Sequence, residues 1–181
     1  MATAVAVSSN PPDVLVDGQG RLMAVRAYGG KVAVSNMRRA RFNRGIWLRR
    51  YGLEDAEATW SKLGTSPDQR LSCDIDGCLY RYHGRTVSLV FGEAALAEDC
   101  WLADVVIAVV PVRRACPAQA GVIDRFDLWR NGGATIWIGE TSIRIETVNG
   151  VRGERHWVPK SERSKRGSKR GSARDQKRPK T

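Results

Sequence analysis

The chain has 181 residues, a net charge of +11, 42% hydrophobic residues and six tryptophans. This length and apolar content suit one globular domain with its own core, and they exclude a wholly disordered chain. The longest apolar run, residues 105–112, has eight residues, whereas a transmembrane helix needs about 20. The start lacks the basic segment of a signal peptide, so the chain as written is predicted to be soluble.

The positive charge is concentrated at the C-terminus. Residues 160–181 carry +8 of the +11, and they include the repeated tetrapeptide Ser-Lys-Arg-Gly at 164–167 and 168–171. A segment of this composition cannot bury enough apolar surface to offset its ordering entropy. We therefore divide the chain into an N-terminal linker (1–12), a domain (13–158) and a disordered basic tail (159–181).

The first half of the domain combines a β-meander with helical periodicity. Residues 13–34 hold three short apolar runs separated by Asp17-Gly18-Gln19-Gly20 and Gly29-Gly30-Lys31, which indicates two hairpin turns. Apolar residues then recur at helical spacing over residues 42–51. Residues 54–63 are predicted to form a second helix, and 64–69 a loop.

The second half alternates hairpins with helices. Hairpins are predicted over 70–82 and 134–148, strands over 86–91, 104–110 and 120–123, and helices over 93–102 and 125–131. Asp124 is the expected N-cap of the last helix, and Gly132-Gly133 ends it. The predicted fold class is α/β (α+β), mixed, with largely antiparallel β-hairpins and interspersed helices.

Four cysteines allow three pairings. Cys73 and Cys78 flank a hairpin turn, where cross-strand sulfurs come within bonding range, which leaves Cys100 to pair with Cys116. Two such disulfides would place the domain in an oxidising compartment. Zinc ligation and four buried free thiols are the alternatives, although the C-x₄-C spacing lacks a second close pair of ligands.

An arginine-rich segment follows the meander, with no acidic residue between Arg38 and Arg50. It is predicted to be a solvated face or, alternatively, a patch that contacts phosphates. The candidate nucleic-acid-binding residues are those of this segment and of the repeated tail motif: Arg38, Arg39, Arg41, Arg44, Arg49, Arg50, Lys165, Arg166, Lys169 and Arg170.

The aromatic residues of the domain are predicted to be core anchors. Trp47, Tyr51 and Trp60 lie at helix-compatible spacing, and Trp129 and Trp137 belong to the last helix and hairpin. Base stacking is the alternative for the first three.

Nothing in the sequence predicts a catalytic or metal site. The two histidines, His83 and His156, are far apart, whereas a metallo-β-lactamase-type hydrolase needs several histidines and aspartates around its metal. His83 is expected in a turn. Asp74 and Asp76 are expected to bond their own backbone in an Asp-x-Asp-Gly turn. We predict no enzymatic activity, no cofactor and no small-molecule substrate.

Several blocks of the chain together carry a family resemblance. They are Val16-Asp17-Gly18, Cys73 with Asp76-Gly77-Cys78, Ala94-Ala95-Leu96-Ala97-Glu98-Asp99-Cys100, Ala103-Asp104-Val105-Val106, Pro111-Val112-Arg113-Arg114-Ala115-Cys116-Pro117 and Val122-Ile123-Asp124-Arg125-Phe126-Asp127-Leu128-Trp129. In combination they resemble the C-terminal soluble region of alphaproteobacterial ComEC proteins, which act in DNA uptake. The likeness extends from residue 13 to about residue 157.

The resemblance implies a reduced metallo-β-lactamase-like sandwich at the periplasmic face of the inner membrane. Its implied partners are single-stranded DNA and a polytopic membrane channel, which this chain lacks. In active relatives a histidine- and aspartate-rich metal motif follows the opening strands, and here residues 36–43 replace it with Asn36-Met37-Arg38-Arg39-Ala40-Arg41-Phe42-Asn43. The predicted function is therefore a non-catalytic domain in natural transformation. The alternatives are a metal-dependent hydrolase or nuclease of that superfamily with unusual ligands, and a structural domain whose basic tail aids solubility or contacts anionic lipid.

Overall fold

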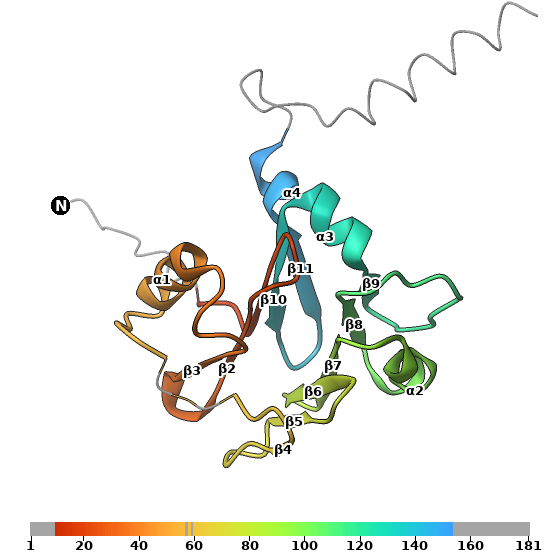
Figure 1. The fold of residues 1–181 in the computed structure, drawn as a ribbon, viewed down its shortest axis with the longest axis horizontal. Coiled ribbons are helices and arrows are strands. Elements are labelled where there is room, and N and C mark those ends of the chain that lie inside the picture. Colours follow the sequence, from red (N-terminus) through yellow and green to blue (C-terminus); the bar gives the residue numbers. More distant parts are fainter. Residues whose placement is uncertain (1–9, 57, 59, 154–181) are drawn as a thin grey trace, which may run out of the picture. The chain divides into compact units, whose positions relative to one another are not determined.

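The fold contains two β-sheets. A computed structural model of the chain describes residues 10–56, 58 and 60–153 (Figure 1). The first sheet is antiparallel throughout. Its strands in spatial order are β11 (Ile143–Thr147), β10 (Gly133–Ile138), β1 (Val14–Asp17), β2 (Met23–Arg26) and β3 (Val32–Val34). The short 3₁₀ turn η1 (Tyr28–Gly30) joins β2 to β3. The meander predicted for residues 13–34 is confirmed.

The second sheet changes from antiparallel to parallel pairing. Its order is β4 (Gly64–Thr65), β5 (Leu71–Cys73), β6 (Gly77–Tyr82), β7 (Arg85–Val90), β8 (Val105–Ala108) and β9 (Gly121–Ile123). Pairing is parallel from β7 to β9, and the 3₁₀ turn η2 (Glu93–Ala95) with helix α2 (Leu96–Leu102) crosses between β7 and β8. Such a crossover is the usual connection between parallel strands. The predicted mixed α+β class is thus confirmed.

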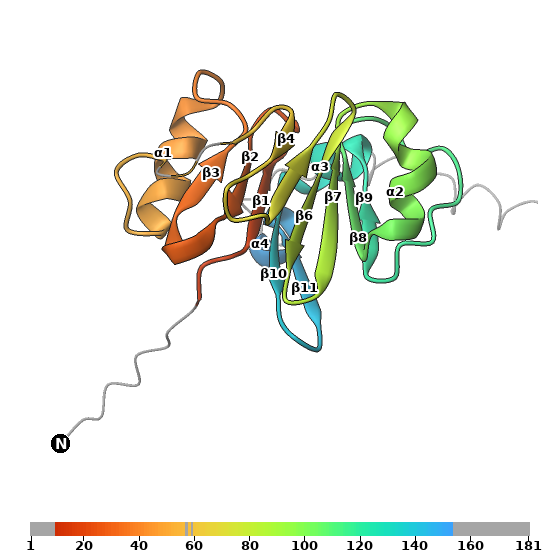
Figure 2. The same ribbon diagram turned by 90° about the horizontal axis from the view of Figure 1, so that it is seen from below.

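The two sheets pack face to face between two helices. Alternate residues of both sheets, among them Val14, Val16, Leu89 and Ile107, form one shared buried cluster. The other face of the first sheet, including Leu15, packs against helix α1 (Arg41–Arg50). Figure 2 shows the resulting order: α1, first sheet, second sheet, α2.

Burial on both faces explains why β1 and β8 are apolar at every position, apart from Asp17. A strand with one face exposed would instead alternate apolar and polar residues. On the α2 side, the side chain of Asp99 is buried and accepts a hydrogen bond from Ser88 Oγ. Burial raises the pKa of Asp99 above its ordinary value.

Helix α3 (Arg125–Asn131) lies as predicted. The Asp124 carboxylate accepts hydrogen bonds from the backbone N–H groups of Phe126 (2.8 Å) and Asp127 (2.9 Å), and the Asp127 carboxylate accepts one from the backbone N–H of Asp124 (3.2 Å). This reciprocal capping box satisfies donors that the first helical turn leaves free. Gly132 ends the helix in the left-handed region, with φ +78°.

The helix predicted for residues 54–63 is wrong. Gly52 ends α1, and the described residues beyond it are irregular. Ala58 forms a parallel bridge with Ala33 at the edge of the first sheet, and its N–H donates to Val32 O at 3.3 Å. Backbone pairing with a distant strand and the packing of Trp60 on the inter-sheet cluster override a weak local helix propensity.

Both predicted disulfides are present, Cys73–Cys78 and Cys100–Cys116, so neither the zinc nor the free-thiol alternative applies. The first is a cross-strand pair of β5 and β6, and the second ties α2 to the segment after β8. On the chain-entropy estimate, loops of these lengths each add roughly 2–3 kcal/mol of stability.

Contacts divide the chain at Gly150. Both sheets belong to the unit Met1–Gly150, and helix α4 (Val148–Arg152) spans the boundary. Of the second unit, Val151–Thr181, the structure describes residues 151–153. The predicted tail, with Lys165, Arg166, Lys169 and Arg170, lies outside the described residues, as does the start of the predicted linker.

Candidate functional site

A groove of about 1030 Å³ lies at one end of the strands. It is bounded by the β1–β2 turn, the residues after β3, the β5–β6 turn, the C-terminal ends of β7 and β8, and helix α3. Crevices beyond the C-terminal ends of parallel strands are frequent binding sites in α/β proteins. The groove is therefore the candidate binding site of the chain.

The lining of the groove is strongly basic. Among the described residues, four cations and a single carboxylate, Asp74, line it. Within the described part of the chain, none of the four cations takes part in an ion pair. They are Arg21, Arg39, Lys62 and Arg125. Such a cluster favours an anionic ligand.

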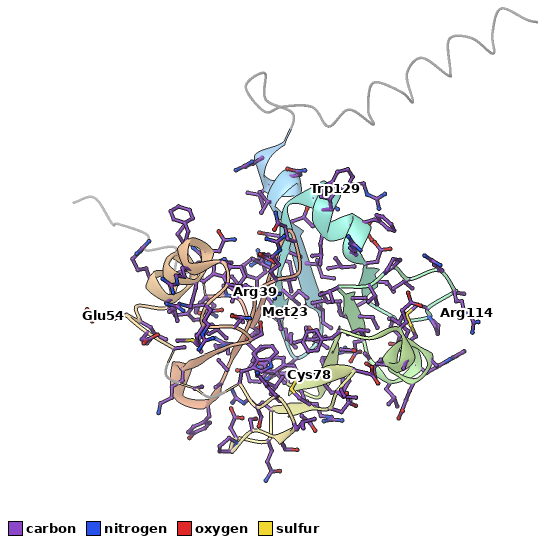
Figure 3. The ribbon with its side chains drawn as sticks, in the orientation of Figure 1. Met23, Arg39, Glu54, Cys78, Arg114 and Trp129 are labelled. Atoms are coloured by element: carbon purple, nitrogen blue, oxygen red, sulfur yellow. A yellow bond between two sulfur atoms is a disulfide. The ribbon has the colours of Figure 1, made fainter. Side chains whose placement is uncertain are left out.

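Aromatic side chains share the groove with these cations. Trp60 and Phe91 are half-buried, and both pack against the cluster between the sheets. Phe126 and Trp129 of α3 are 48% and 69% exposed. Trp129 is labelled on α3 in Figure 3. The predicted core position of Trp129 is therefore wrong, because α3 buries Leu128 instead. Basic side chains interleaved with aromatic rings are typical of grooves that hold single-stranded nucleic acid.

The β1–β2 turn fixes the position of Arg21. The Asp17 carboxylate accepts hydrogen bonds from the backbone N–H groups of Arg21 (2.7 Å) and Leu22 (3.3 Å). Gly18 packs so tightly on Gly132 that a Cβ would lie 2.8 Å from the Gly132 carbonyl carbon. This contact joins the turn to the C-terminal end of α3.

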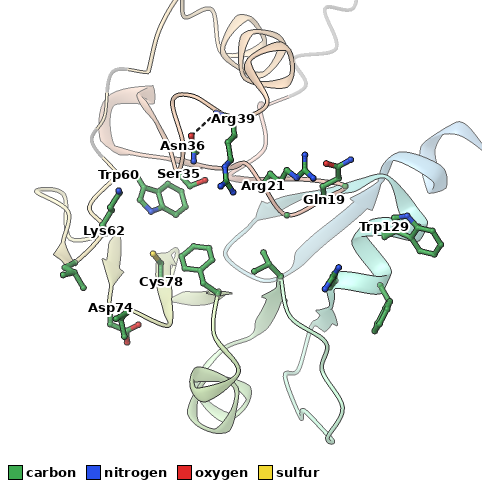
Figure 4. A pocket seen from close by; sticks show the side chains of 18 residues that line it. Gln19, Arg21, Ser35, Asn36, Arg39, Trp60, Lys62, Asp74, Cys78 and Trp129 are labelled. Atoms are coloured by element: carbon green, nitrogen blue, oxygen red, sulfur yellow. Dashed lines mark hydrogen bonds between the residues drawn. The ribbon is translucent and has the colours of Figure 1, made fainter.

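The segment before α1 fixes the position of Arg39. Asn36 Oδ1 accepts hydrogen bonds from the backbone N–H groups of Arg38 and Arg39, both at 2.9 Å. This is the local side-chain bonding that asparagine favours in turns. Figure 4 shows Asn36 and Arg39 joined in this way at the rim of the groove.

The β5–β6 turn forms the opposite wall. Asp74 Oδ1 accepts hydrogen bonds from the N–H groups of Asp76 and Gly77, both at 2.8 Å, so the predicted turn role of Asp74 is confirmed. The Cys73–Cys78 disulfide closes the same turn, and Cys78 lines the groove. This wall is held both covalently and by hydrogen bonds.

Of the predicted arginines that the structure describes, one lies in the groove. Arg39 lines it, and Arg38 sits in the turn before α1. Arg41, Arg44, Arg49 and Arg50 belong to α1, where 100° per residue points them in different directions around the helix. The predicted arginine patch is thus not a single face of α1.

Sequence reasoning missed three of the groove cations: Arg21, Lys62 and Arg125. Each is isolated in the sequence, so no local cluster marks it. The glycine turn before Arg21 and the N-cap before Arg125 are local features that place both residues at element ends, where binding residues gather. Neither feature predicts that the β1–β2 turn and the start of α3 line the same groove.

The described residues contain no group of three or more His, Cys, Asp or Glu side chains arranged to hold a metal ion. His83 lies in the β6–β7 turn as predicted, with φ +49° and its ring 4.0 Å from that of Tyr82. His156 lies outside the described residues. Among the helices of the described part, none has the length and apolar character needed to cross a bilayer.

Comparison of the chain with models of protein families, with curated protein sequences and with solved structures finds no match.

Proposed function

We propose that the chain is a non-catalytic domain of a ComEC-type DNA-uptake protein and that it holds single-stranded DNA in the basic groove. One observation carries the proposal: four cations outside any described ion pair, drawn from four separate segments, face one groove together with aromatic rings. Guanidinium groups suit phosphate because their planar N–H donors match its oxygens. The ComEC resemblance supplies the biological setting.

The disulfides support the periplasmic part of this proposal. Disulfides persist in oxidising compartments such as the bacterial periplasm and are rare in the cytosol. At the periplasmic face of the inner membrane, the domain would work beside the polytopic channel region that the resemblance implies. Its task there would be to hold DNA that the channel moves.

We place no catalytic step in the groove. Hydrolysis of the metallo-β-lactamase type relies on a metal that lowers the pKa of a bound water. The described lining offers a single carboxylate and no histidine, and that carboxylate already bonds the backbone of its own turn. The chemistry that these residues favour is the binding of phosphates.

Salt dependence tests the proposed DNA binding. We expect the full chain to bind an oligo-dT 12-mer with an affinity that falls steeply between about 50 and about 200 mM salt, because DNA contacts release counterions. Four groove contacts alone correspond to a slope of log K against log salt of about −3, and contacts from the tail would steepen it. Fluorescence anisotropy of a labelled 12-mer measures this slope. Salt-independent affinity, or no binding at the low-salt end, would contradict the proposal.

A further inference from the structure

Helix α3 presents an aromatic face to the groove. Phe126 and Trp129 are three residues apart, and Arg125 precedes Trp129 by four, so all three share one side of the helix. Leu128 is 1% exposed and faces the core instead. The exposed aromatic side therefore contributes little to packing within the described fold.

Another aromatic residue, Trp60, lies at the other end of the groove. Trp60 is partly buried and packs against the cluster between the sheets. Figure 4 shows Trp60 and Trp129 at opposite ends of the groove, with Arg39 and Arg21 between them in that view. These cations and aromatic rings line the same groove.

We propose that the groove selects single-stranded over duplex nucleic acid through base stacking. Phe126 and Trp129 would form the main stacking platform and Trp60 a second one. Arg21 and Arg39 would bind the phosphates of the strand between these two aromatic platforms. This inference rests on the proposed function, since it assumes that nucleic acid occupies the groove. A duplex keeps its bases stacked on each other and cannot offer their faces to these rings, whereas every base of a single strand can.

Stacking of this kind has a measurable size. A base stacked on an aromatic side chain contributes about 1–3 kcal/mol, which corresponds to about 5- to 150-fold in affinity, with little dependence on sequence. We therefore expect the wild-type chain to bind an oligo-dT 12-mer at least about tenfold more tightly than an abasic strand of the same length. The two strands carry the same phosphate charge, so charge alone predicts equal binding.

The test is the double variant Phe126→Ala with Trp129→Ala in the full chain, measured against oligo-dT, the abasic strand and a duplex of equal length. We expect the variant to lose the preference for oligo-dT while it keeps its affinity for the abasic strand. A second variant, Phe126→Ala with Trp129→Tyr, should keep part of the preference that the double alanine variant loses, because tyrosine also stacks on bases. Trp101→Ala is the matched control, since Trp101 is 79% exposed but lies on α2, outside the groove.

The outcomes separate this inference from the proposed function. If the double variant still prefers oligo-dT over the abasic strand, the stacking platform is overturned while DNA binding stands. An equal loss in Trp101→Ala would overturn it as well, because exposed aromatic surface in general would then explain the effect. If the wild-type chain binds neither strand, the proposed function fails first.

Discussion

Reversing two groove charges, Arg21→Glu with Arg39→Glu, is expected to weaken oligo-dT binding by about 100-fold or more at low salt. A hydrogen bond to a charged partner contributes about 1.5–3 kcal/mol, so two lost phosphate contacts account for about 3–6 kcal/mol. The introduced carboxylates add repulsion. Both arginines lie in turns whose hydrogen bonds involve their backbone N–H groups. Replacing their side chains therefore leaves the turns intact and removes the contacts with the ligand. Anisotropy titration of the full chain measures the loss.

The control for this pair is Lys31→Glu with Arg81→Glu. Both residues are exposed and lie toward the opposite ends of β2, β3 and β6 from the groove, and the net charge changes by the same amount. We expect this variant to lose less than about fivefold in affinity, because distant exposed charges are largely screened. Equal losses in the two variants would show that binding follows total charge and would contradict the groove as the site.

Gly133→Ala is expected to lower the free energy of unfolding by about 3 kcal/mol. Gly133 has φ +111°, and an added Cβ would lie 2.7 Å from Val16 O and 3.1 Å from Gly18 N. Neither atom can move without breaking the β1–β10 pairing at this point. Urea unfolding followed by tryptophan fluorescence measures the change. A variant within about 0.5 kcal/mol of wild type would refute the tight contact between β10 and the β1–β2 turn.

The matched control is Gly45→Ala in α1. Only Arg49 Nη1, at 3.7 Å, comes near the position of its added Cβ, and φ of Gly45 is not in the left-handed region. Alanine in a helix interior is more favourable than glycine by about 1 kcal/mol. The same substitution should therefore stabilise the protein at position 45 and destabilise it at position 133. The opposite signs would separate crowding from the general effect of adding a methyl group.

Elements marked by local chemistry could be predicted from the sequence. The Asp17-Gly18-Gln19-Gly20 turn marked the first hairpin, and the N-cap Asp124 placed α3 at its observed bounds. The pairing of Cys73 with Cys78 followed from the turn between them. In each case, the residues that favour the turn, helix or disulfide lie within a few positions of it in the sequence.

What could not be predicted depends on contacts between distant segments. Ala58 pairs with Ala33 of a distant strand instead of following the helical pattern of its own segment. The periodicity of α3 does not say which side faces the core, so the exposure of Trp129 had no local indicator. The groove itself exists because the β1–β2 turn packs on Gly132, more than 100 residues away. No local pattern could have joined Arg21 to Arg125.

The most direct test of the account locates the DNA on the protein. An oligo-dT strand carrying a photoreactive thymine analogue is cross-linked to the full chain, and the attached peptides are identified by mass spectrometry. The account predicts cross-links at Trp60 and on the α3 peptide that holds Phe126 and Trp129. Cross-links confined to residues 154–181, or to residues distant from the groove such as Tyr28 and Trp101, would contradict it.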